Sequence, residues 1–367
     1  MIVHYSTVHK GLDIRIFYKQ CLSLKAQGYQ IALAMDLTRL ESATCEERGI
    51  QHIPIKTHGN FIMRNLFTNI YNTYKVLKRK PQIIHFHDPE LVIIMGILSL
   101  FGYKIIYDMH EDFQEDVKLK GKGLIFDTFI APLLTSIEFW ISVECFYIIC
   151  ATNHIKSRYI LYTDQISVIK NYPLKLKINS NVDNTTTKTS KIVYIGDITP
   201  ARGYYEMVRI AELLGEKFEL CLIGKVSQEL ILHAKETTRK LKNIRFLGFI
   251  SYDMLFDYCR DALCGIILLH PIETFKVSLP TKIFDYMNFG LPIICSDFKH
   301  FRVYFRDHDC ITYVEPYDIH HIVKKIINLT ADTANYKRQS IIAKQAIANE
   351  FSWENQAVYL NSIYSDL

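Results

Sequence analysis

The chain has 367 residues, of which 49% are hydrophobic and 22% charged, and its formal net charge is +5. This length exceeds one typical core and suits two domains, and the composition excludes wholesale disorder. The nine cysteines are scattered without a Cys-x-x-Cys pair, which excludes a disulfide framework and a thiolate zinc site and indicates a reducing, cytoplasmic location.

The N-terminus runs from Met1 to Thr7 directly into a polar loop, without a basic start or a small-residue cleavage site, so we predict no cleavable signal peptide. The most apolar run, 124–150, is interrupted by Asp127, Glu138 and Glu144. We predict a buried helix there, feeding the strand 147–151, rather than a membrane span.

Apolar, β-rich runs alternate with longer helical segments along the whole chain. In the first half the runs are 2–3, 31–34, 52–55, 83–86, 104–107, 148–150 and 167–169, and in the second half they are 192–195, 219–223, 244–247, 265–269 and 291–295. The alternation predicts an α/β protein with two Rossmann-like, doubly wound parallel-sheet domains facing a cleft. We expect an N-terminal domain at 1–172, a linker at 173–190 and a second domain at 191–350.

Polar residues follow the predicted strands, where ligands gather in open α/β sheets. They are His85, His87 and Asp88 after one strand, Asp108, His110 and Glu111 after another, and the loop 196–203 after a third. The alternative for each histidine is a satisfied buried side chain, and for His85 this alternative is favoured.

The segment 279–295 places Lys282 and Asp285 on one face of a predicted helix. Pro280 suits the first turn and Gly290 the end of this helix. A helix start with an adjacent lysine attracts phosphate, and a carboxylate one turn later suits a ribose diol. A surface ion pair at i,i+3 is the simpler alternative.

This segment resembles the donor-site motif of retaining GT-B glycosyltransferases of group 1, the family-4-like enzymes of the bacterial surface-polysaccharide type. Further landmarks that resemble this family occur in its order at 6–19, 85–91, 106–111, 194–203 and 351–353. The resemblance implies the two-domain GT-B fold and a C-terminal helix, within 351–367, that crosses back to the first domain.

The resemblance also implies roles for single residues. His110 takes the position of a histidine against the donor sugar, and Arg202 takes a position usually held by lysine. Together with Lys282, Arg202 would clamp the diphosphate, so His110, Arg202 and Lys282 are the predicted catalytic residues. The donor-binding residues are Gly11, Gly196, Arg202, Glu273, Lys282 and Asp285. The acceptor-side candidates are His87, Asp88 and Glu111, of which Asp88 and Glu111 could instead orient His110.

Three positions depart from the family pattern. Asp197 stands where many relatives have a second basic residue, and Val277 stands where many have a glutamate, with Glu273 four residues earlier. The ribose ligand is Asp285 rather than a glutamate. These departures keep open a non-catalytic glycan-binding subunit on a transferase scaffold.

Segment 56–80 is basic and aromatic, since no acidic residue occurs between Glu47 and Asp88. It suits an anionic membrane surface, with a solvated helix face as the alternative. Arg-rich and aromatic nucleic-acid signatures are absent from the sequence, so no nucleic-acid partner is expected.

The sequence therefore predicts a cytoplasmic enzyme, peripheral on the inner face of the plasma membrane if the membrane contact holds. It would transfer a sugar from a nucleoside diphosphate sugar, with UDP favoured because it is common in similar enzymes, to a saccharide or polyprenyl-linked acceptor. No cofactor or metal is required, and surface polysaccharide or lipopolysaccharide assembly is the implied setting. The alternative from another class is a metal-dependent hydrolase using His85, His87 and Asp88.

Overall fold

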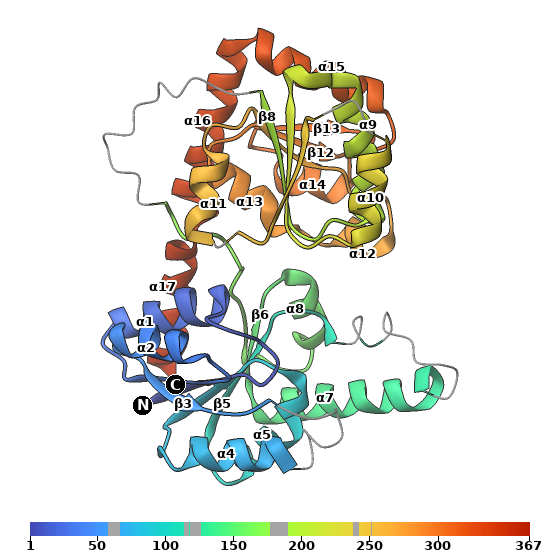
Figure 1. Ribbon diagram of the computed structural model, residues 1–367. Coiled ribbons are helices and arrows are strands. Elements are labelled where there is room, and N and C mark those ends of the chain that lie inside the picture. The colour runs from blue at the N-terminus through green and yellow to red at the C-terminus, as the bar shows by residue number, and fades with distance from the viewer. Residues whose placement is uncertain (58–66, 114–116, 118–125, 177–189, 238–241, 251) are drawn as a thin grey trace. The chain divides into compact units, whose positions relative to one another are not determined.

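The computed structural model describes residues 1–57, 67–113, 117, 126–176, 190–237, 242–250 and 252–367. The chain divides into two compact units, each an α/β structure (Figure 1). Unit 1 comprises Met1–Asn171 and Trp353–Leu367, and unit 2 comprises Tyr172–Ser352.

Most of the predicted linker, at 177–189, lies outside the described residues. Its described start belongs to unit 2, because Asn288 Nδ2 donates to Leu174 O (2.8 Å) and Lys175 Nζ donates to Ala348 O (2.8 Å). The predicted domain boundary at 172 thus falls next to the observed division between Asn171 and Tyr172.

Unit 1 contains a seven-stranded, all-parallel sheet of order β3-β2-β1-β4-β5-β6-β7. Its strands are β1 (Ile2–Tyr5), β2 (Ile31–Met35), β3 (Gln51–Pro54), β4 (Ile83–Phe86), β5 (Lys104–Met109), β6 (Tyr147–Cys150) and β7 (Ile166–Val168). Its helices are η1 (Ile14–Cys21), α1 (Leu22–Ala26), α2 (Arg39–Glu47), α4 (Asn69–Leu77), η3 (Pro89–Leu91), α5 (Val92–Leu100), η4 (Phe126–Ile130), α7 (Ala131–Cys145), α8 (Asn153–Tyr159) and α17 (Trp353–Asp366).

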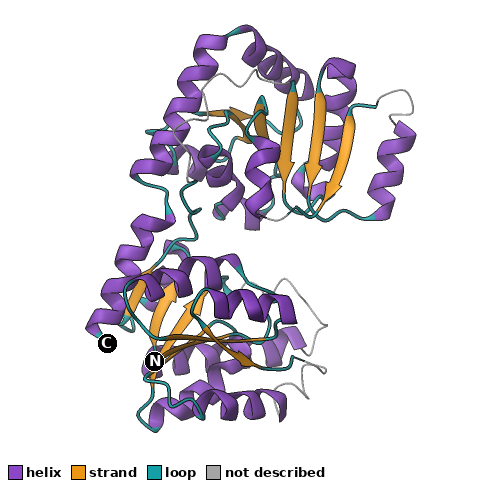
Figure 2. Ribbon diagram, turned by 60° about the vertical axis from the view of Figure 1, so that its left-hand side comes forward, coloured by secondary structure: helices purple, strands orange, loops and turns teal. Residues whose placement is uncertain are grey.

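Unit 2 contains a six-stranded parallel sheet of order β10-β9-β8-β11-β12-β13. Its strands are β8 (Lys191–Ile195), β9 (Glu219–Ile223), β10 (Ile244–Gly248), β11 (Cys264–Ile267), β12 (Ile293–Ser296) and β13 (Ile311–Val314). Its helices are η5 (Pro200–Arg202), α9 (Tyr204–Leu214), η6 (Gly215–Lys217), α10 (Gln228–Thr237), α11 (Tyr252–Cys259), α12 (Glu273–Val277), α13 (Thr281–Asn288), α14 (Lys299–Tyr304), α15 (Ile319–Ala331) and α16 (Thr333–Asn349). Helices cover both faces of each sheet (Figure 2).

The two faces of the unit 1 sheet differ in polarity. Val3, Tyr5, Ile84, Phe86 and Tyr107 alternate along β1, β4 and β5 and form an apolar core with α4, α5, α7 and α8. The residues between them face the other side, where His4 pairs in register with His85 on the neighbouring strand. Helices η1 and α17 lie over this polar face, since Trp353 Nε1 donates to Lys19 O (3.1 Å) and His85 Nδ1 lies 2.5 Å from Tyr364 Oη.

Helix α7 corrects the prediction of a buried helix. Only 17% of the window Thr128–Cys145 is buried, and Phe129, Leu133 and Trp140 are exposed. The helix packs on α5, where Ser99 Oγ donates to Cys145 O, and Phe139 stacks on Tyr159 of α8, whereas Leu133 and Trp140 face outward. By length and composition this is the single described helix that could cross a membrane.

Candidate functional site

Helix α13 contains the donor-side residues predicted from segment 279–295. Pro280 is its extended N-cap (φ −69°, ψ 125°), and the chain turns after the helix at Gly290 (φ +69°). The side chains of Ile283, Phe284 and Met287 pack into the core of unit 2. This apolar face fixes the orientation of the helix.

Tyr286 fixes α13 against the end of β8. Its hydroxyl accepts a hydrogen bond from Ile195 N (3.0 Å) and donates to Val193 O (3.1 Å). Because Lys282 lies one helical turn earlier, the same contact positions the lysine beside the loop that follows β8.

Lys282 is a buried cation with an altered pKa. The residue is only 8% exposed, and its Nζ donates to Tyr194 Oη (2.9 Å) and lies 4.2 Å from the centroid of that ring. Burial, and then the like charge of Arg202, lowers the pKa of Lys282 to about 7. Lys282 is therefore poised to take up a proton when an anion binds.

Gly196 brings the backbone close to both cations. Its φ is +120°, and a Cβ placed on it would lie 3.0 Å from Lys282 Nζ and 3.8 Å from Arg202 Nη1. A side chain at this position would crowd the ammonium group, so glycine suits the close approach. The structure thus brings together Gly196, Arg202 and Lys282, which the sequence had placed in one donor site.

Arg202 ends the short helix η5 and is held by its surroundings. The next residue, Gly203, has φ +80°, and a Cβ there would lie 2.3 Å from Leu268 O. The Arg202 guanidinium carbon lies 5.8 Å from the centroid of the Phe275 ring of α12. Two adjacent cations beside the loop after β8 have the charge and the donors that a diphosphate requires.

The other donor-side predictions have different surroundings. Asp285 is partly exposed on α13, one turn after Lys282. Glu273 is 89% exposed and pairs with Lys276 (2.7 Å). Gly11 belongs to unit 1 and adopts φ +65°, where a Cβ would lie 2.6 Å from Glu41 Oε1.

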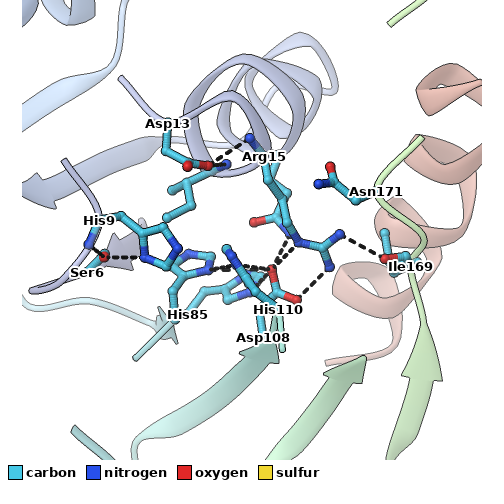
Figure 3. Close-up of polar contacts among 12 residues, drawn as sticks. Ser6, His9, Asp13, Arg15, His85, Asp108, His110, Ile169 and Asn171 are labelled. Atoms are coloured by element: carbon cyan, nitrogen blue, oxygen red, sulfur yellow. Dashed lines mark hydrogen bonds and ion pairs between the residues drawn. The ribbon is translucent and has the colours of Figure 1, made fainter. Parts of the chain in front are cut away.

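His110 follows β5 in unit 1 and is held by a buried carboxylate (Figure 3). Its Nε2 lies 3.0 Å from Asp108 Oδ2 and 3.1 Å from His87 Nδ1. The side chain of His110 is 16% exposed, whereas that of Asp108 is fully buried. The geometry therefore makes Asp108 the group that orients the His110 ring.

Asp108 forms a buried ion pair with Arg15, a residue that was not among the predicted site residues. Arg15 Nε and Nη2 donate to its two oxygens (3.0 and 2.7 Å), and Gln20 Nε2 also donates to it (2.6 Å). Burial opposes ionisation, but the charges of Arg15 and His110 outweigh it and hold the pKa of Asp108 well below its ordinary value. Asp13 Oδ1 accepts from Arg15 N (2.8 Å) and so caps η1, the helix that carries Arg15.

The prediction of acceptor-side roles for His87 and Asp88 needs correction, because both side chains are buried. Asp88 Oδ2 accepts hydrogen bonds from Ser6 Oγ (2.8 Å) and Thr7 N (2.5 Å), and Oδ1 lies 3.1 Å from His9 Nδ1. Asp88 therefore fastens the loop after β1 and does not orient His110. Glu111 is the one acceptor-side candidate that is exposed.

The same contacts correct the metal-hydrolase alternative. That alternative required Asp88 to join His85 and His87, but the Asp88 carboxylate is engaged by the loop after β1. Burial lowers the pKa of His85 well below its ordinary value and that of His87 to about 3. His85 is buried, which agrees with the alternative favoured from the sequence. Its Nε2, however, has no hydrogen-bond partner among the described residues.

Comparison with solved structures identifies the architecture as the GT-B fold of glycosyltransferases. HepE of Anabaena, solved in complex with UDP, is 12% identical with a TM-score of 0.71, covering 100% of both chains. Sucrose-phosphate synthase from Thermosynechococcus elongatus is 13% identical with a TM-score of 0.69, covering 100% of this chain and 98% of that one. WaaG, a glycosyltransferase involved in lipopolysaccharide biosynthesis, is 12% identical with a TM-score of 0.68 over 99% of each chain.

Residues 177–346, which lie within unit 2, match the family described as glycosyl transferases group 1. No curated protein matches the sequence. The predicted fold class and the resemblance to group 1 glycosyltransferases are thereby confirmed.

Proposed function

We propose that this protein transfers a sugar from a nucleoside diphosphate sugar, with UDP as the favoured nucleotide, to a saccharide or lipid-linked acceptor with retention at the anomeric carbon. The observation that carries the proposal is the convergence of Lys282 and Arg202 on Gly196 within the residues that match the group 1 family. HepE supports the choice of nucleotide, because it was solved with UDP and with UDP-glucose.

The two cations would act on the leaving group. When the sugar departs, the diphosphate gains negative charge, which Lys282 and Arg202 neutralise where it develops. Asp285 accepts hydrogen bonds from the ribose hydroxyls. The cations hold the diphosphate in this scheme, so its steps require no metal ion.

His110 would contact the donor sugar near the reacting carbon. Asp108 fixes the imidazole ring through Nε2, and a ring held in place is effective both in positioning the sugar and in stabilising developing charge. Glu111 is the exposed group on the same segment that can meet an acceptor hydroxyl.

The transfer reaction is tested with the purified chain and a panel of UDP-sugars. Lys282→Ala and Arg202→Ala are each expected to lower turnover by about 100-fold or more, as for loss of one group that stabilises a developing anion. Lys299→Ala, at an exposed site on α14, is the matched control and should retain turnover. Normal rates in both cation variants would refute the clamp, and release of the inverted anomer, seen by NMR of the product, would refute retention.

His110→Ala is expected to lower kcat by about 100-fold and to leave the Kd for UDP within about twofold, because it removes a contact to the sugar and none to the nucleotide. Circular dichroism of the variant is the control for folding. An unfolded variant would instead assign His110 to the interior structure of unit 1.

We propose further that the protein binds peripherally to an anionic membrane, and exposed aromatic and basic side chains at and near α4 support this. Phe67 and, on α4, Ile70, Tyr71 and Tyr74 are exposed. Lys75 lies over the Tyr71 ring (4.9 Å) and Lys78 over the Tyr74 ring (4.7 Å). Aromatic groups beside cations suit the interface of a bilayer. Residues 58–66 of the predicted segment 56–80 lie outside the described residues.

Helices α5 and α7 extend this apolar surface on the same face of the sheet (Figure 1). Leu100 is 82% exposed and Phe101 77%, and on the α7 side Phe129 is 71% exposed. A lipid-linked acceptor and assembly of surface polysaccharide or lipopolysaccharide on the inner face of the plasma membrane fit this surface. The stated involvement of WaaG in lipopolysaccharide biosynthesis supports the same setting.

A further inference from the structure

Three histidines stack on the polar face of the unit 1 sheet. His4 on β1 pairs in register with His85 on β4, and His87 follows two residues later on the same face. The ring centroids of His4 and His85 are 4.4 Å apart, and those of His85 and His87 are 4.7 Å apart. All three side chains are buried. We call these residues the histidine cluster.

The ring nitrogens of the cluster converge. One nitrogen from each imidazole lies within 4.8 Å of the other two, and His4 Nδ1 is 3.2 Å from His87 Nε2. For two ligands of one tetrahedral zinc ion at 2.0–2.1 Å, the nitrogens are expected about 3.3 Å apart. The His4–His87 spacing, which is a hydrogen bond while no ion is bound, suits joint ligation of a single ion, and the His85 nitrogen lies within 4.8 Å of both.

Two nitrogens of the cluster lack hydrogen bonds. Among the described residues, His85 Nε2 and His4 Nε2 have no hydrogen-bond partner, although both are buried. The nearest carboxylate oxygen, Asp108 Oδ2, is 4.0 Å from His85 Nε2, too far for a hydrogen bond. A buried polar atom without a partner is unfavourable and calls for a ligand or a water molecule. An ion in the cluster would satisfy His85 Nε2, whereas His4, whose Nδ1 faces His87, would keep its Nε2 for a water molecule.

The opposite nitrogens of His85 and His87 do have partners. His85 Nδ1 lies 2.5 Å from Tyr364 Oη, and His87 Nδ1 lies 3.4 Å from Asp108 Oδ2. Metal-binding histidines use their second nitrogen in this way, bonding a carboxylate or another polar group that fixes the ring. These contacts leave Nε2 of both residues available to a ligand: His87 Nε2 lies 3.2 Å from His4 Nδ1, and His85 Nε2 has no hydrogen-bond partner among the described residues.

We propose that His4, His85 and His87 bind one divalent transition-metal ion, with Zn²⁺ as the best-suited species. Imidazole donors suit zinc, copper, iron and nickel, whereas magnesium, calcium and manganese prefer oxygen ligands. The ion would join β1 to β4 and, through Tyr364, to α17. It would also supply positive charge next to Asp108, the residue that orients His110. This site is separate from the donor site in unit 2.

The test uses the full chain without a histidine tag, freed of metal by a chelator and titrated with Co²⁺. Visible d–d absorption should saturate at one ion per chain, and Zn²⁺ should displace the signal. Zn²⁺ should also raise the apparent Tm, because an ion that binds only the folded state stabilises it. Absence of a stoichiometric Co²⁺ spectrum would overturn the proposal and leave a cluster that encloses water.

Variants locate the ion. His85→Asn and His87→Asn should lower Co²⁺ affinity by at least 100-fold, and Tyr364→Phe should lower it 10- to 100-fold, as for loss of a group that fixes a ligand. His321→Asn, at an exposed histidine on α15, is the control and should bind normally. Loss of binding in His321→Asn alone would place the ion elsewhere and refute the assignment.

Two further measurements keep the result unambiguous. If circular dichroism shows that a histidine variant is unfolded, the Tyr364→Phe variant remains as the test. An unchanged Co²⁺ affinity in Tyr364→Phe would refute the site. UDP should raise the Tm of His4→Gln as it does for the parent chain, since Lys282 and Arg202 lie in unit 2. Retained UDP binding thus separates a failed metal site from a failed donor site.

Discussion

A buried lysine next to an arginine is electrostatically unfavourable until an anion arrives. Lys282 has lost most of its water, and its hydroxyl partner, Tyr194, is neutral. The lowered pKa of Lys282, about 7, reflects this desolvation first and the charge of Arg202 second. A diphosphate between the two side chains would reverse both effects.

Nucleotide binding is therefore expected to depend on pH. Below pH 7 Lys282 is already protonated, whereas above pH 7 it must gain a proton when the diphosphate binds. The affinity for UDP should fall by up to about tenfold per pH unit between pH 7 and 9, a range above the phosphate pKa of about 6. Calorimetric titrations at these pH values, in buffers of different ionisation enthalpy, measure both the affinity and the proton uptake.

Lys282→Arg provides the control for this pH dependence, because arginine stays charged throughout the range. Its UDP affinity should be level between pH 7 and 9. A level profile in the parent chain would show that Lys282 is already charged before the nucleotide binds.

At the residue scale the sequence predicted that Lys282 and Arg202 lie together, but it did not predict the pairing of Arg15 with Asp108 in unit 1. Lys282 and Arg202 stand in local motifs that can be read directly. Arg15 and Asp108 are 93 residues apart, and nothing local indicates that they pair. The one available signal was an arginine within the otherwise apolar segment Ile14–Phe17.

At the scale of single elements, strands were predictable where apolar runs were long. β13 (Ile311–Val314) was not predicted, although Thr312 and Tyr313 favour a strand, because only two of its four residues are aliphatic. The exposure of α7 was also missed. Its apolar residues surround the helix on all sides, so the sequence pattern does not show which side faces the core.

Glu138 is the buried carboxyl group of α7. Its Oε2 accepts a hydrogen bond from the Tyr159 hydroxyl (3.2 Å), and its Oε1 accepts one from Ser142 Oγ (3.4 Å). Burial raises the pKa of Glu138 to about 7 despite these hydrogen bonds.

Glu138→Gln should therefore change how stability depends on pH. Between the unfolded pKa, 4.5, and the folded value of about 7, the folded state binds more protons, so its stability falls as pH rises. The variant stays neutral and avoids this loss. It should match the parent near pH 4.5 and be more stable by up to about 3 kcal/mol at pH 8.

Urea unfolding followed by tryptophan fluorescence measures this effect, because the chain's two tryptophans, Trp140 and Trp353, both lie in unit 1. Glu144→Gln is the matched control, since Glu144 is exposed on the same helix. Equal stabilisation by both substitutions would mean that a general charge effect, and not the burial of Glu138, is responsible.

At the scale of the whole molecule, the sequence predicted two parallel-sheet domains, and both sheets are present. The strand and helix periods carry that information. Substrate identity is not carried in the same way, because one fold serves many sugars and acceptors. The proposed membrane surface was predictable only in part. The sequence showed the basic charge of segment 56–80, but it did not show which sides of α5 and α7 face outward.

The membrane surface gives a prediction for the intact protein. It should sediment with vesicles containing anionic phosphatidylglycerol and much less with neutral phosphatidylcholine vesicles, and added salt should weaken the binding. Replacing Lys78 and Arg79 together by glutamate should remove most of the binding. Replacing Lys324 and Lys325 of α15 in unit 2 is the control. Equal binding to neutral vesicles, or equal loss in the control, would contradict an anionic docking surface on unit 1.

Because unit 1 is closed by the helix Trp353–Asp366, this part of unit 1 is made only after the whole of unit 2. The polar side of β4 stays uncovered until Tyr364 arrives, while all residues of unit 2 have already been made. The later half of the gene product should consequently reach its native form before the earlier half does. A released chain that ends at residue 352 would then hold one complete domain attached to one that lacks its closing helix.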